Sequence, residues 1–128
     1  MANQVTNIGG VLSAVTTTIA YTDSSAVTIA TIPANSQIVD INIDVTTAFN
    51  AGTTNTVTVG KTGSASAFVA STSVGSAGRA SVASTGVYSA WADTGSSDIS
   101  AIITYSQTGT VASAGALRVT IVYKSYAP

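Results

Sequence analysis

Within residues 37–47 apolar and polar side chains alternate from Val39 to Val45, and this period of two constrains the fold more than any other feature. The two parities of the run are Val39, Ile41, Ile43 and Val45 against Asp40, Asn42 and Asp44. Successive side chains of a β-strand point to opposite faces of its sheet, so the segment is predicted to be a strand with one buried face. Residues 117–124 repeat the pattern, with an apolar set of Leu117, Val119, Ile121 and Tyr123. We expect these two strands to anchor the fold.

Weaker strand signals fill much of the remaining chain. Runs rich in β-branched and aromatic residues occur at 15–21, 27–32, 56–59, 87–91 and 99–105. Clusters of Gly, Asn, Ser and Pro separate them, and no segment shows a sustained helical period. The sequence therefore predicts an all-β fold, an antiparallel β-sandwich of jelly-roll type, because short antiparallel strands must each bury one face.

Chain length and local composition suggest how this sandwich is bounded. A chain of 128 residues fits one domain, which we place at residues 11–128. Residues 1–10 are uncharged and end in two glycines, so we expect an extended N-terminal arm that packs on a neighbour. Residues 62–86 are mostly Ser, Ala, Gly and Thr. Long unstructured loops are uncommon inside small domains, and Phe68 supplies an apolar anchor, so we expect a long ordered loop there.

The side chains available for catalysis are few. The chain has no histidine, no cysteine and no glutamate. Asp40 and Asp44 lie four strand residues apart, about 13 Å, which is too far for a glycosidase pair. The 18 serines have no histidine to act as base. We expect no enzyme activity and no cofactor. Residues 93–98 hold two aspartates, hydroxyls and a glycine, a weak resemblance to a calcium loop that leaves calcium binding there open.

The same shortage of charge shapes the expected surface. Charged residues make up 7% of the chain, the net charge is -1 and the mean hydropathy is +0.43. Such a surface gives little protection against association, so we expect an oligomer. No apolar run is long enough to span a membrane, and four basic residues offer no track for nucleic acid, so neither partner is expected.

Arginine and aromatic side chains are the natural anchors of a protein contact. We take as candidate interface residues Arg79, Trp91, Tyr88, Tyr126 and Phe68. Aromatic side chains can also form a platform that stacks on sugar rings, and this alternative stays open.

Several segments together resemble small β-sandwich structural proteins of tailed bacteriophages. They are residues 32–36 with the strand that follows, residues 48–52 and 56–60, residues 77–79, and the closing run 113–123. The resemblance implies a virion structural protein, a capsid cement or decoration protein. Such a protein would sit on the capsid exterior as a homotrimer and clamp the major capsid protein. The alternative within the same resemblance is a tail or head-fibre component that binds host glycan.

Overall fold

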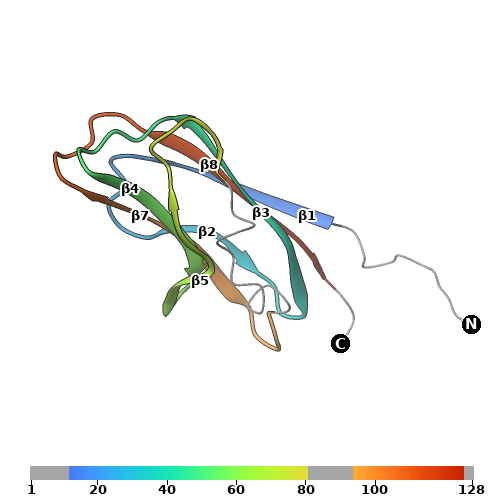
Figure 1. The fold of residues 1–128 in the computed structure, drawn as a ribbon. Coiled ribbons are helices and arrows are strands. Elements are labelled where there is room, and N and C mark those ends of the chain that lie inside the picture. Colours follow the sequence, from blue (N-terminus) through green and yellow to red (C-terminus); the bar gives the residue numbers. More distant parts are fainter. Residues whose placement is uncertain (1–11, 81–93, 126–128) are drawn as a thin grey trace, which may run out of the picture.

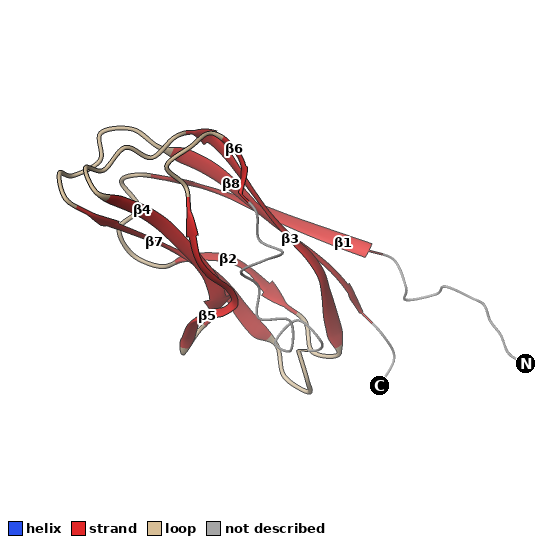
Figure 2. Cartoon of the chain, viewed as in Figure 1, coloured by secondary structure: helices blue, strands red, loops and turns tan. Residues whose placement is uncertain are grey.

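The computed structural model describes residues 12–80 and 94–125, and every regular element in them is a β-strand (Figures 1 and 2). In chain order the strands are β1 (Leu12–Ala20), β2 (Val27–Ile32), β3 (Ser36–Thr47), β4 (Thr54–Lys61), β5 (Ser64–Ser73), β6 (Gly78–Ala80), β7 (Ile99–Thr108) and β8 (Ala116–Ser125). The described ranges contain no helix that would be suited to crossing a bilayer.

The eight strands form two four-stranded antiparallel sheets that pack face to face. The strand orders are β1-β8-β3-β6 and β2-β7-β4-β5. The pairs β1 with β8, β2 with β7, β3 with β6, and β4 with β5 are nested, as in one long hairpin rolled up on itself. Strand pairs β3 with β8 and β4 with β7 complete the sheets. This is jelly-roll topology, so the predicted fold class is confirmed.

The core lies between the sheets and consists mainly of the apolar side chains that the strands direct inward. The largest side chains buried there are Phe49, Phe68, Ile19, Ile32, Ile41, Ile43, Ile103, Leu117 and Ile121. Both predicted anchor strands contribute, since β3 and β8 lie side by side in one sheet. Burial of large aliphatic and aromatic side chains contributes about 1.5–3 kcal/mol each, which makes this cluster the main source of stability.

One detail of the predicted anchor strand is wrong. Val39 was expected on the buried face, but its side chain is 42% exposed and Ile38 is buried instead. The pairing of β3 with β8 shifts register between Ile38 and Asp40. At such a β-bulge two residues of one strand oppose one residue of the other, so the alternation changes phase. From Ile41 onward the predicted parity holds.

As far as it is described, to Ala80, the segment predicted as a long ordered loop is largely strand. β5 occupies residues 64–73 and pairs with β4 through a tight connection at Thr62 and Gly63. Gly63 has a φ of 87°, a conformation that favours glycine. Phe68 and Val69 bury their side chains in the core. The arm expected at residues 1–10, the strand expected at 87–91 and the end of the 62–86 segment lie outside the described residues.

The loops at one end of the sandwich are tied together by Asn50. Its side-chain oxygen accepts hydrogen bonds from the backbone N–H groups of Ser113 and Ala114, at 2.8 and 3.0 Å. These contacts join the β3–β4 and β7–β8 connections. Gly115 follows with a φ of 149°, and a Cβ built there would lie 2.5 Å from the ring of Phe49. The loop therefore requires glycine at this position.

Candidate contact surfaces

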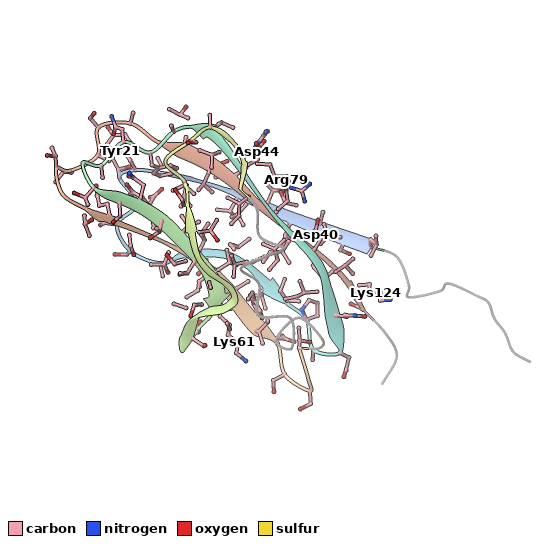
Figure 3. All side chains as sticks on the ribbon, in the orientation of Figure 1. Tyr21, Asp40, Asp44, Lys61, Arg79 and Lys124 are labelled. Carbon is pink, nitrogen blue, oxygen red and sulfur yellow. The ribbon has the colours of Figure 1, made fainter. Side chains whose placement is uncertain are left out.

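The outer face of sheet β1-β8-β3-β6 carries two ion pairs. Arg118 of β8 donates to the Asp44 carboxylate of β3 at 2.8 Å, and Arg79 of β6 lies 3.9 Å from Asp40. Figure 3 shows Asp44, Arg79 and Asp40 following one another along this side of the molecule. We call Asp40, Asp44, Arg79 and Arg118 the charged face. All four side chains are well exposed, so each ion pair contributes little stability.

The outer face of the other sheet is lined by hydroxyl groups. β4 and β7 align three cross-strand pairs there, Thr54 with Thr108, Thr56 with Ser106, and Thr58 with Thr104. We call these six residues the hydroxyl face. In the strands of this sheet, as far as they are described, the one charged residue is Lys61 at the end of β4 (Figure 3). The sandwich therefore has one side with two ion pairs and one side whose described strands hold a single charge.

Hydrogen bonding within the hydroxyl face is uneven. The Oγ1 atoms of Thr54 and Thr108 lie 2.6 Å apart and share a hydrogen bond. The Oγ1 atom of Thr104 is buried and has no hydrogen-bond partner within the described chain. A buried hydroxyl without a partner costs free energy, roughly 1–3 kcal/mol.

Two of the predicted interface residues fall within the described chain, and they do not lie together. Arg79 lies exposed on the charged face beside Asp40, whereas Phe68 is buried in the core with 2% of its surface exposed. Tyr88, Trp91 and Tyr126 lie outside the described residues. We therefore base no contact surface on Phe68. The hydroxyl face was missed by sequence reasoning, although the alternation of threonine with valine along residues 56–59 is a signal for it.

The weak calcium-loop signal at residues 93–98 has a structural explanation in its described part. The Asp98 carboxylate accepts a hydrogen bond from the Ala34 N–H at 2.9 Å. The Thr94 hydroxyl donates to the Pro33 carbonyl and accepts from the Ser36 N–H. These bonds fasten the β2–β3 turn. Asp93 lies outside the described residues, and the described residues hold no cluster of three or more potential metal ligands from Asp, Glu, His or Cys.

The aromatic side chains that the structure describes belong to the core or pack against it. Phe49 and Tyr105 have ring centroids 4.6 Å apart, and both rings are buried. Tyr21 and Tyr123 are half-buried and pack against the same cluster. Burial raises the pKa of the Tyr105 phenol above its usual value of 10.0. Within residues 12–80 and 94–125, no exposed aromatic platform for a sugar is formed.

Comparison with known proteins gives likenesses of structure only. No protein-family model matches the chain, and no curated protein does either. A chain in the capsid asymmetric unit of cyanophage Pam1 superposes with a TM-score of 0.70 at 19% identity, covering 98% of this chain and 93% of that one. A chain in the capsid of Ralstonia phage GP4 gives a TM-score of 0.61 at 17% identity, covering 100% and 93%. At these identities the likeness establishes a shared fold.

Proposed function

We propose that this chain is a bacteriophage virion structural protein, and specifically a capsid cement or decoration protein that binds the outside of the major capsid protein shell. The observation that carries the proposal is the likeness to chains from two phage capsids, which extends over almost the whole of both partners. Because nearly all of each chain is covered, the capsid proteins concerned are about as long as this one. The family resemblance of the sequence segments supports the same role.

The hydroxyl face supports a role in docking. Burying a charged group without a partner costs several kcal/mol, whereas hydroxyl groups can exchange water for the polar groups of a neighbouring protein. Thr56, Thr58 and Ser106 present such groups on a sheet surface without ions. We therefore assign the hydroxyl face to the shell and the charged face, with its solvated ion pairs, to water.

The proposal includes self-association as a homotrimer. Few charges and many small side chains let surfaces of two copies approach without desolvating ions, and a shell repeats every weak contact by symmetry. A tail or head-fibre protein that binds glycan is the competing assignment. It requires exposed aromatic rings, and the described residues supply none.

A reconstruction of the assembled virion tests the assignment. We expect density for this sandwich on the outer surface of the shell, at local threefold positions, with the hydroxyl face towards the major capsid protein. Density confined to the tail contradicts the cement role and favours the fibre role. Density on the shell with the charged face inward retains the role but overturns the assigned orientation.

A further inference from the structure

The two sheets have four edge strands in the described chain, and three of them are poorly suited to pairing with another strand. β2 has a register irregularity around Ile29, whose carbonyl accepts a hydrogen bond from Thr17 at 3.2 Å. β5 shifts register twice along β4. β6 is three residues long and presents the charged Arg79. Bulges, short length and charge are the features by which natural sheets prevent edge pairing.

β1 differs from the other three edges. Its nine residues pair with β8 without a register shift and include no charged residue and no proline. Leu12, at its start, is 56% exposed. Within the described residues no strand occupies the other side of β1. A long, regular and uncharged edge is the kind that accepts an additional strand.

The hydrogen bonds at the end of β1 identify which backbone groups face outward. Tyr21 donates its N–H to the Gly115 carbonyl. Every second residue counted back from Tyr21 along β1 therefore directs its backbone groups towards β8. Ala20 uses both of its backbone groups on Asp23, donating to the carboxylate at 2.8 Å and accepting from the Asp23 N–H at 3.0 Å. In an antiparallel pair the bonded and outward-facing residues alternate. The N–H and C=O groups directed to the open edge therefore belong to Leu12, Ala14, Thr16 and Thr18.

Asp23 also defines the end of this open edge. Ala20 is the next residue whose backbone groups face outward, and Asp23 already forms hydrogen bonds with both of them. An added strand can pair with residues 12–18 and must stop there. The available edge is seven residues long, roughly 20 Å at about 3.3 Å per residue.

We propose that this edge binds residues 2–8 of a second copy of the chain, which add to β1 as a fifth strand of its sheet. The inference rests on the self-association included in the proposed function. Residues 2–8 are also seven residues long and uncharged, and Gly9 and Gly10 separate them from β1. Each copy then donates one segment and accepts one, a heterologous contact that closes into a ring when three copies meet.

Folding back within one chain is the competing arrangement. A reversal at residues 9–11 would place residue 8 opposite residue 12 and residue 2 opposite residue 18, so edge length alone does not separate the two. Donation between copies is favoured because a surface with few charges gives little protection against association.

Hydrogen exchange and molecular mass measured on the purified full chain, without shells, test the pairing. In the wild type we expect a trimer in which the amides of residues 12, 14, 16 and 18 exchange at least about tenfold more slowly than in a variant lacking residues 2–8. Ala14→Pro removes an outward N–H without removing a bond to β8, so it should yield monomers. Ala14→Ser keeps that N–H and should remain trimeric. Circular dichroism checks that each variant is folded.

Disulfide capture separates donation between copies from folding back. The chain has no cysteine, so every disulfide that forms joins two introduced cysteines. Differently tagged copies, one with Gln4→Cys, Val5→Cys or Thr6→Cys and one with Ala14→Cys, are refolded together and oxidised. We expect a cross-linked pair of unlike copies for at least one arm position, because bonded cysteines need Cα atoms about 5.5–6 Å apart. Ser66→Cys, exposed on β5, replaces Ala14→Cys as the control and should give no pair.

Three outcomes overturn the inference: rapid exchange of all four amides, a wild-type mass unaffected by both the deletion and Ala14→Pro, or slow exchange in a monomer without cross-links between copies. The last outcome means that the segment folds back on its own chain. None of these measurements uses the shell. Strand donation between copies and binding to the shell are therefore tested separately, and either can fail while the other succeeds.

Discussion

The Tyr105 hydroxyl on β7 donates a 2.7 Å hydrogen bond to the Asn55 side-chain oxygen on β4. The same oxygen accepts from the Ala51 N–H at 2.9 Å, and the Asn55 amide nitrogen donates to the Ala51 carbonyl at 3.2 Å. One amide side chain thus joins two strands of a sheet to the β3–β4 connection. Tyr105 is 4% exposed, so its phenol has little access to water as an alternative partner.

Asn55→Ala is expected to destabilise the fold more than Tyr105→Phe. Removing the phenol leaves Asn55 bonded to Ala51 and costs about 1 kcal/mol, whereas removing the amide leaves the buried phenol without its acceptor and costs roughly 2–3 kcal/mol. Chemical denaturation of both variants and the double variant measures the difference. Equal losses for the two single variants would contradict the role given to Asn55.

Stability is expected to fall at alkaline pH through Tyr105. Burial raises the pKa of its phenol above 10.0, so above that pH the unfolded chain loses the proton more readily than the folded chain does. The contribution is complete below about pH 10 and is lost as the pH rises towards the folded pKa. Melting temperatures between about pH 8 and 11 should show a steeper decline for the wild type than for Tyr105→Phe. Parallel curves would rule out Tyr105 as the source.

Gly115→Ala should destabilise the protein more than Gly63→Ala. Both glycines have positive φ, so each substitution introduces backbone strain of about 1–3 kcal/mol. At Gly63 a Cβ meets nothing within 4 Å, but at Gly115 it meets the Phe49 ring. Overpacking adds about 1–3 kcal/mol there. Thermal unfolding of the two variants measures the difference in stability. A similar loss in both would show that the loop moves away from the Phe49 ring at no cost.

A charge placed on the hydroxyl face should weaken binding to the shell. Thr58→Lys inserts an ammonium group beside Thr104, where docking would bury it, and we expect at least about tenfold weaker binding, equivalent to 1.4 kcal/mol. Asn42→Lys adds the same charge to the other sheet and should bind as the wild type does. Co-sedimentation of each variant with purified shells provides the measurement. If Asn42→Lys is the weaker binder, the charged face is the docking side.

Some parts of the fold follow from local pattern and others do not. β3 and β8 were predictable because Ile41, Ile43, Leu117 and Val119 keep strict alternation. The bulge at Val39 was not, because it arises from pairing with a strand more than 80 residues away. β5 was missed because Ser and Ala dominate it and its irregular pairing with β4 places Phe68 and Val69, neighbours in sequence, both in the core.

The candidate surfaces were harder to predict than the strands. The polar side of β3 was identified from the sequence. The arginines that pair with its aspartates, Arg79 and Arg118, come from strands that the sheet topology places beside β3. The hydroxyl face needs β4 and β7 in register, which aligns Thr58 with Thr104. The role of Asp23 depends on the path of the chain after Ala20. In each case the decisive neighbour is fixed by long-range pairing, which a single sequence does not display.

The position of β8 between β1 and β3 determines when this protein can fold. The last strand of the chain fills the middle of its sheet, so β1 and β3 have no common partner until residues 116–125 have left the ribosome. A chain dominated by such distant pairings folds slowly, and its unpaired strands are exposed to aggregation meanwhile. The sheet can therefore form only after β8 has been synthesised, and a chain that ends before Ala116 lacks the strand that joins β1 to β3.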